Sequence, residues 1–211
     1  MKQIKHATLF ATLLILLLSS CSSSKFTTKK PVNVSPFYHE NTEGQKQLIL
    51  TDQKGNILFL DEEKLEGAEL LMGYNQMLEI TKPKKSDQYK VTKKLETSMD
   101  TMTCVINDIW VLKKIEGEEV NKNAPTLTID LRKKRAYGHS GCNRYSTSVS
   151  LFENHSIKFG MIAATKMYCP NIDIENTYLN ALQKCDQYQI KDRHLHLMQG
   201  EKILLSFLKV D

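Results

Sequence analysis

The stretch Tyr137–Ser146, YGHSGCNRYS, decides the fold of the C-terminal half of the chain. Its glycines, cysteine and asparagine are typical of a tight backbone bend that needs positive φ. A second stretch, Thr165–Pro170, TKMYCP, carries another cysteine and ends in proline, which stops a strand from continuing. The sequence therefore predicts two bends of a β domain. Either Cys142 and Cys169 join the bends as a disulfide, or the two cysteines are incidental.

Alternating apolar residues on both sides of these bends predict a series of short strands. Residues 126–131 alternate strictly, which is typical of a strand with one buried face. Further strands are expected at residues 109–112, 149–151, 157–159, 188–190, 195–197 and 203–207. Because short turns separate them, neighbouring strands should pair antiparallel.

One helix is expected between the second bend and the closing strands. Asn171 or Asp173 can cap its N-terminus. The apolar residues that recur there at helical spacing are Ile174, Tyr178, Ala181, Leu182 and Cys185. The sequence thus predicts a mainly β (α+β) fold, an antiparallel sheet or open barrel with one packed helix.

Five blocks of this half, in their order, resemble the META domain, the HslJ family of bacterial envelope proteins. They are Trp110–Leu112, Pro125–Ile129, Gly138–Tyr145, Ala164–Pro170, and Glu175 followed by Tyr178–Leu182. The resemblance implies a β-rich domain with a packed helix and carries no known reaction. It also implies roles in envelope stress, heat shock and antibiotic tolerance. The motif residues expected to be structural are Trp110, Gly138, Gly141, Asn143, Arg144, Thr165, Pro170 and Glu175.

The first residues resemble the signal peptide of a bacterial lipoprotein. Lys2 and Lys5 precede an apolar run at residues 7–18 that is too short to span a bilayer comfortably. Residues 18–21, LSSC, resemble a lipobox, so residues 1–20 would be removed and Cys21 lipidated. An ordinary secretory signal is the alternative. Ser22 stands where aspartate would resemble an inner-membrane retention signal, and residues 22–30 hold no acid. We therefore expect an outer membrane lipoprotein facing the periplasm.

The remaining cysteines are even in number, which in an exported protein indicates disulfides. The pair Cys142–Cys169 is favoured, since both lie in the family blocks and border expected turns. Cys104 and Cys185 would then form the second pair. Free buried thiols are the alternative.

The chain before the META-like half divides into two parts. Residues 21–40, rich in Ser, Thr, Lys and Pro, are expected to be the lipidated cysteine and a flexible tether. Residues 41–103 hold short apolar runs separated by turns, which predicts a small β-rich domain, OB-like in outline. The META-like domain is then expected at residues 104–211.

The composition and charge narrow the class of function. Hydrophobic content of 41% and charged content of 25% fit a globular protein. Removal of Lys2 and Lys5 with the signal peptide lowers the net charge from +5 to +3, which is too small and too evenly spread to indicate a nucleic-acid partner. The expected contacts are the membrane through the lipid anchor and an unknown envelope protein or apolar ligand.

No stretch carries a complete catalytic signature. Residues 138–141, GHSG, have Cys142 where a nucleophile elbow needs glycine, and strand rather than helix is expected after them. His194 and His196 share a strand face, but no third metal ligand is placed by the sequence. We therefore expect a non-enzymatic binding or assembly module without a cofactor. The alternatives are a thiol-redox or metal-binding enzyme using Cys142, Cys169 and His139, and a lipid carrier or secretion pilot.

Overall fold

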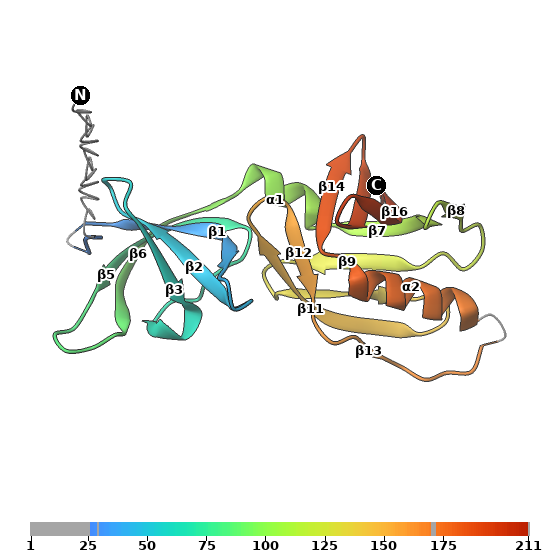
Figure 1. Cartoon of the computed structure of the whole chain (residues 1–211), viewed down its shortest axis with the longest axis horizontal. Coiled ribbons are helices and arrows are strands. Elements are labelled where there is room, and N and C mark those ends of the chain that lie inside the picture. The colour runs from blue at the N-terminus through green and yellow to red at the C-terminus, as the bar shows by residue number, and fades with distance from the viewer. Residues whose placement is uncertain (1–25, 29, 170–171, 211) are drawn as a thin grey trace, which may run out of the picture.

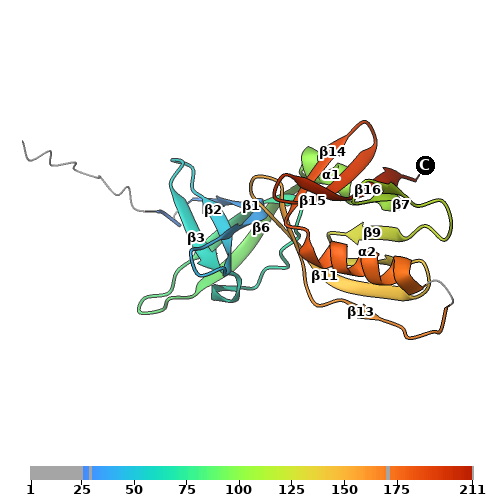
Figure 2. The ribbon, with the colours of Figure 1, turned by 45° about the vertical axis from the view of Figure 1, so that its right-hand side comes forward.

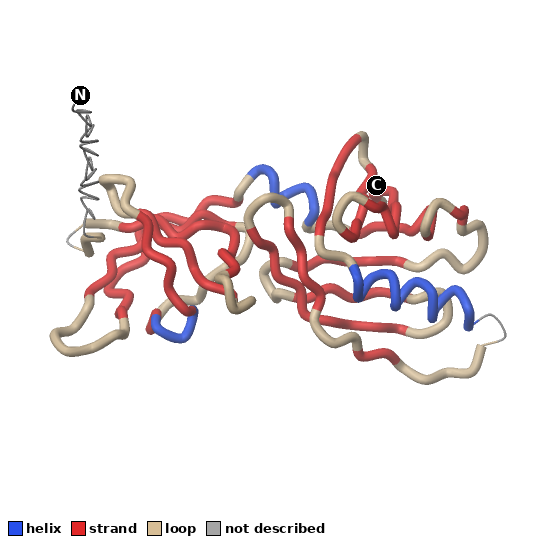
Figure 3. The backbone as a smooth tube through the Cα atoms, viewed as in Figure 1, coloured by secondary structure: helices blue, strands red, loops and turns tan. Residues whose placement is uncertain are grey.

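The structure, a computed structural model, describes residues 26–28, 30–169 and 172–210 of the 211-residue chain. The expected signal peptide, the lipidation at Cys21, the motif residue Pro170 and the helix cap at Asn171 lie outside these residues. The described chain forms two adjacent units (Figure 1), and strands make up most of its backbone (Figure 3). No helix within the described residues is long and apolar enough to span a membrane.

The N-terminal unit is a sheet of six strands in the order β3-β2-β1-β5-β6-β4. A single turn of 3-10 helix, Glu62–Lys64, precedes β4. The strands are β1 (Val32–Glu40), β2 (Lys46–Thr51), β3 (Ile57–Asp61), β4 (Leu65–Glu66), β5 (Tyr74–Thr81) and β6 (Tyr89–Met99). One face buries alternating apolar side chains, among them Val32, Val34, Leu48, Leu50, Leu78 and Ile80.

The prediction of a flexible tether at residues 21–40 is wrong for its last part. Residues 32–40 are strand β1, which pairs with both β2 and β5. Val32, Val34 and Tyr38 alternate along it with their side chains buried. Serine and proline hid this pattern, because proline at position 36 lowers strand propensity although the flanking apolar residues keep a period of two.

Helix α1 (Thr101–Ile106) joins the two units. Thr103 of this helix contacts Gly73, which lies just before β5. The Thr103 hydroxyl donates a hydrogen bond to the Gly73 carbonyl at 2.9 Å. Gly73 has φ +82°, and a Cβ there would lie 2.9 Å from Leu131 of the second unit. Only glycine satisfies both the backbone angle and this close approach.

The C-terminal unit is a closed ring of eight strands in the order β10-β9-β7-β16-β15-β14-β12-β11, with β11 paired back to β10. The short strands β8 and β13 pair with β7 and β11. The strands are β7 (Ile109–Ile115), β8 (Glu118–Glu119), β9 (Thr126–Asp130), β10 (Arg135–His139), β11 (Arg144–Phe152), β12 (Ser156–Phe159), β13 (Ala163–Ala164), β14 (Gln187–Lys191), β15 (His194–Gln199) and β16 (Lys202–Lys209). The expected mainly β fold is confirmed, with the sheet closed rather than open.

Helix α2 (Ile172–Lys184) lies across the ring (Figure 2). It contacts β7, β15 and β16 and buries Tyr178, Ala181 and Leu182 against them. Trp110 on β7 is fully buried, as expected, and its indole N–H donates to the Ile106 carbonyl at 3.0 Å. The strands and the helix therefore share one core.

The two units are joined through β1 as well as through α1. Tyr38 pairs in parallel with Phe152 of β11, and their rings lie 6.1 Å apart. The Lys134 ammonium donates to the Tyr38 hydroxyl at 2.9 Å and to the Glu62 carboxylate at 2.6 Å. A parallel strand pair and a three-residue polar cluster thus connect the units.

Candidate functional site

The GHSGCN bend is a tight turn between β10 and β11. The Ser140 N–H donates to the Asn143 carbonyl at 2.8 Å, and Gly141 has φ +100°. A Cβ on Gly138 would lie 2.0 Å from the Thr126 carbonyl oxygen, so the strands can approach only if this residue is glycine. Glycine is therefore required at position 141 by the backbone angle and at position 138 by a close contact.

The buried carboxylate of Glu175 on α2 holds this bend. It accepts hydrogen bonds from the Ser140 hydroxyl, from the Asn143 N–H at 2.8 Å and from the Asn143 side-chain amide at 3.0 Å. Burial raises the pKa of Glu175, but these donors outweigh burial and hold the pKa below its ordinary value. The helix is thereby locked to the bend by a charged acceptor.

Asn143 links the same bend to the TKMYCP stretch. Its side-chain oxygen accepts from the Thr165 hydroxyl at 2.7 Å and from the Met167 N–H at 2.8 Å. The amide nitrogen faces Glu175, so both ends of the side chain are used. Asn143 therefore has the backbone-fixing role that asparagine often takes in bends.

The predicted disulfide Cys142–Cys169 is present, with its Cα atoms 6.1 Å apart. The predicted pair Cys104–Cys185 is wrong, since both cysteines are free thiols. Cys104 is exposed on α1, whereas Cys185 is buried after α2 and donates to the Ala181 carbonyl at 3.2 Å. Burial raises the pKa of Cys185 to about 12, so this thiol stays protonated at neutral pH.

Two tyrosine hydroxyls extend the polar cluster into the core. The Tyr145 hydroxyl donates to the Thr126 carbonyl at 3.0 Å, and the Tyr178 hydroxyl lies 2.5 Å from that of Tyr145. Burial raises the pKa of both phenols. Within the described residues no buried side-chain nitrogen or oxygen lacks a partner, so the bend is a satisfied network.

The histidines considered as ligands are dispersed. His139 is exposed, and its Nδ1 accepts the Gly141 N–H at 3.1 Å. His194 and His196 stack with their ring centres 6.2 Å apart; burial, then the neighbouring His194, lowers the pKa of His196. Across the described ranges no three His, Cys, Asp or Glu residues are grouped so that they could hold a metal ion.

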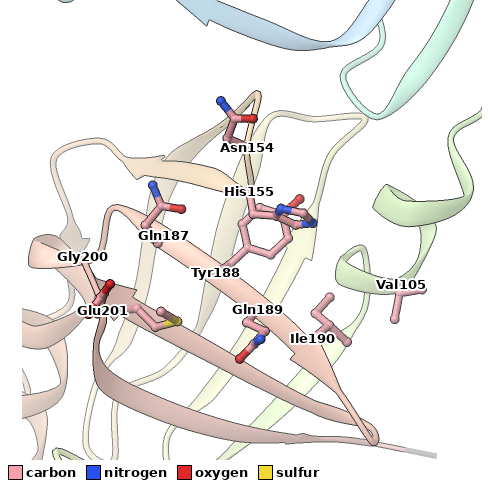
Figure 4. A pocket seen from close by; sticks show the side chains of 10 residues that line it. Val105, Asn154, His155, Gln187, Tyr188, Gln189, Ile190, Gly200 and Glu201 are labelled. Carbon is pink, nitrogen blue, oxygen red and sulfur yellow. The ribbon is translucent and has the colours of Figure 1, made fainter.

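A groove of about 720 Å³ opens on another side of the META-like unit, between α1 and the β14–β15 hairpin (Figure 4). The β11–β12 turn forms one end, where Asn154 and His155 both have positive φ and the His155 ring lies 5.5 Å from that of Tyr188. The lining residues are Val105, Asn154, His155, Gln187, Tyr188, Gln189, Ile190, Met198, Gly200 and Glu201.

The groove combines apolar walls with amide side chains. Val105, on α1, is 40% exposed and faces the strand that carries Tyr188 and Ile190 across the opening (Figure 4). Gln187 and Gln189 supply hydrogen-bonding groups beside this apolar wall. Ligand sites of proteins have this composition, mostly apolar with a few polar groups that fix orientation.

Sequence reasoning brought together some of these residues and missed others. It paired Cys142 with Cys169, but it treated Glu175 only as a motif residue and gave it no partner. A lone carboxylate among apolar helix positions that meet a core was the available signal. The groove was missed entirely, because its two walls come from segments about 80 positions apart whose contact no local pattern encodes.

The chain is similar to several solved structures and to one protein family. A protein from Burkholderia xenovorans, solved by NMR, is 26% identical, with the match covering 56% of this chain and 96% of that one at a TM-score of 0.43. A duf4847 family protein from Bacteroides vulgatus, solved by crystallography, is 16% identical, covering 53% and 100% at a TM-score of 0.38. No curated protein matches. The model of the META domain matches residues 102–211, more than half of the chain, and the chain therefore belongs to the META domain family.

Proposed function

We propose that this protein is a bacterial envelope lipoprotein, anchored by Cys21 in the outer membrane and facing the periplasm. Its META domain acts as a non-enzymatic binding module, and the groove between α1 and the β14–β15 hairpin receives an apolar or amphipathic ligand. A role in envelope stress tolerance follows from the family resemblance. The groove is the observation that carries the binding function.

Its size and lining both support this role. A volume of about 720 Å³ lies within the range of roughly 300–1,000 Å³ that is typical of small-molecule sites. Val105 and Ile190 offer apolar contact, and Gln189 offers an amide to a polar group at one end of the ligand. Such a site would hold one apolar chain with a polar head.

The bend supports a structural rather than a catalytic role for its polar residues. Glu175, Asn143 and Ser140 hydrogen-bond one another and the backbone. Cys142 is 5% exposed and bonded to Cys169. A thiol or acid–base reaction at this position would first have to break the contacts that hold α2 to the sheet.

A lipid carrier or secretion pilot is the second candidate, and the same apolar wall favours it. Native mass spectrometry of the chain from Ser22 to Asp211, produced in an oxidising compartment, separates the two. A retained lipid would favour the carrier. Protein without a bound lipid that still takes up an added ligand would favour the binding module.

The groove itself is tested with the uncharged apolar dye Nile red, because an anionic dye would be attracted by the introduced arginine. Val105→Arg places a charge at the rim of the groove without entering the core, since Val105 is 40% exposed. We expect the dye to bind at least about five-fold more weakly, as one lost apolar contact and one buried charge imply. Leu95→Arg, at a position 38% exposed on β6, is the matched control. Equal dye binding by both variants, or turnover of a substrate that one substitution abolishes, contradicts the proposal.

A further inference from the structure

The positive charge of the protein is concentrated in one segment. Residues 131–172 hold seven of the 29 Lys and Arg residues but only one of the 24 acids, Glu153. This segment carries +6, while the other 169 residues, with 22 basic and 23 acidic side chains, carry −1. The expectation of an evenly spread charge is therefore wrong, and the excess belongs to the strands around the bend.

Strands β10 and β11 present part of this charge on their solvent side. In their antiparallel ladder Tyr137 is opposite Ser146, and His139 is opposite Arg144. Arg135 lies two positions before Tyr137 and so shares its face; its guanidinium donates to the Ser146 hydroxyl at 3.1 Å. The two arginines are exposed, and Tyr137 is 41% exposed between them.

The segment 160–169 borders this face and exposes large apolar side chains. It contains β13, which pairs with β11, and it runs along the lower edge of the domain in Figures 1 and 2. Met161 and Tyr168 are each 93% exposed, and Met167 is 58% exposed. Large apolar side chains that are exposed together, rather than singly, mark surfaces that contact a protein or a membrane.

Two cations next to these side chains, Arg144 and Lys166, are not neutralised. Residues 154–169 contain no Asp or Glu, and among the described residues no acid forms an ion pair with Arg144 or Lys166. Three other cations of the basic segment differ, because they form ion pairs: Lys133 with Asp130, Lys134 with Glu62 and Lys158 with Glu40. An uncompensated cationic strip thus lies along an exposed apolar edge.

We infer that this face, defined by Arg135, Tyr137, Arg144, Met161, Lys166 and Tyr168, docks on an anionic lipid surface. The cations attract headgroup phosphates, which contributes about five-fold in affinity for each cation close to the surface. Tyrosine prefers the boundary between headgroups and acyl chains, because its ring is apolar and its hydroxyl is polar. Charge complementarity favours this partner over a neutral one, and a fluid surface admits separate apolar side chains without a matching contour.

This inference depends on the proposed function only in placing the protein beside a membrane. Its test therefore uses protein without the acyl anchor, the chain from Ser22 to Asp211. The buried core and the hydrophobic residues packed on it all lie between Phe26 and Phe207, so this chain keeps all of them. Failure of lipidation at Cys21 would be seen separately, by acyl labelling, and would not alter the result.

The experiment is co-sedimentation with vesicles of equal parts phosphatidylglycerol and phosphatidylcholine, compared with phosphatidylcholine alone. We expect binding to the anionic vesicles only, and weaker binding when salt rises from ~0.1 to ~1 M, which shortens the Debye length from about 10 to about 3 Å. Arg144→Gln with Lys166→Gln should lower the affinity by about 25-fold. The matched control, Lys93→Gln with Lys94→Gln on the exposed part of β6, should stay within about two-fold.

Insertion is tested with Tyr168→Trp. Trp110 is fully buried, so a blue shift of the emission on adding anionic vesicles would report the new indole entering the interface. Ile57→Trp, at a position 56% exposed on β3, should show no shift. Equal binding to both kinds of vesicle, no binding at all, or full binding by the Arg144 and Lys166 double variant would each overturn the inference.

Discussion

The Glu175 carboxylate accepts the backbone N–H of Asn143 at 2.8 Å, across 32 positions of sequence. The carboxylate stands on α2 and the amide in the turn between β10 and β11, so the contact joins the helix to the ring of strands. The donors hold the pKa of Glu175 below its ordinary value although burial acts in the opposite direction. The fold therefore favours the charged form of this side chain.

Stability should depend on the charge of Glu175. A folded-state pKa below the unfolded value stabilises the fold above the unfolded value, and the gain is lost as pH falls through the folded pKa. Glu175→Gln should cost about 1–3 kcal/mol at neutral pH, because buried donors lose a charged acceptor. The gap to wild type should shrink as acidity rises. Urea unfolding at a series of pH values measures the loss of stability and its dependence on pH. Asp173→Asn, at an exposed position of the same helix, is the control. A difference in unfolding free energy between Glu175→Gln and wild type that stays constant with pH would contradict this account.

The disulfide should carry a measurable part of the stability. Cys142 and Cys169 are 27 positions apart, and closing a loop of that size stabilises by roughly 3 kcal/mol in the chain-entropy model. The double variant Cys142→Ser with Cys169→Ser should lose about that much in denaturant unfolding. Cys104→Ser should change stability by less than ~0.5 kcal/mol, since Cys104 is exposed. The intact mass should be two hydrogens below the fully reduced value. A mass four hydrogens below it would show that Cys104 and Cys185 also form a disulfide.

The tyrosine pair should respond unequally to deletion of its hydroxyls. Tyr145→Phe leaves both the Tyr178 hydroxyl and the Thr126 carbonyl without this partner, and should cost about 1–3 kcal/mol. Tyr178→Phe leaves Tyr145 bonded to Thr126 and should cost about 0.5–1.5 kcal/mol. Thermal unfolding of the two variants gives the order, and the reverse order would show that the hydroxyls are arranged differently.

The contact between the units should appear as coupling in a double-mutant cycle. Lys134 and Glu62 are 29% and 34% exposed and lie 2.6 Å apart. Hydrogen bonds from Lys134 to Glu62 and Tyr38 hold the pKa of Lys134 above its ordinary value although burial lowers it. Lys134→Met and Glu62→Gln, alone and combined, should give about 1 kcal/mol of coupling. The exposed pair Lys90 and Glu66, at 3.9 Å, is the control and should give less; equal coupling in both pairs would refute the prediction.

The lipid anchor is tested in a bacterial host. Wild-type protein should incorporate labelled palmitate and remain with the membrane fraction, because two or more acyl chains anchor stably. Cys21→Ser should abolish labelling, and at ~1 M salt, which screens attraction to anionic lipid, it should also abolish retention in the membrane fraction. Cys104→Ser also removes a cysteine, and it should leave both unchanged. Wild-type protein that takes up no label would indicate an ordinary secretory signal, and labelling that survives Cys21→Ser would place the acyl chain on another residue.

The META half was largely predictable because its signals are local. The alternation of Leu127, Ile129 and Leu131 gives a period of two, and the helix repeats its apolar positions at a period of 3.6. All three strand residues are buried in the structure. The bend was predictable from Gly141, whose positive φ is the ordinary reason for glycine at a turn.

The predictions that were wrong concern contacts between segments, which a local sequence pattern does not encode. Only the even number of cysteines predicts a pair Cys104–Cys185, and an even number says nothing about where the chain places a thiol. The composition of β1 resembles a linker and therefore predicts a tether. Its strand character comes from pairing with β2, which follows directly, and with β5 and β11, which lie far from it in sequence.

Strand β1 is hydrogen-bonded along both edges, to β2 on one side and β5 on the other, and it also touches β11 near its end. A pull on the chain ahead of Val32 therefore reaches a strand that is held on both sides. β1 can leave the sheet only if its hydrogen bonds to both neighbours break, whereas an edge strand has one neighbour. β1 thus ties the N-terminal side of the described chain to both folded units.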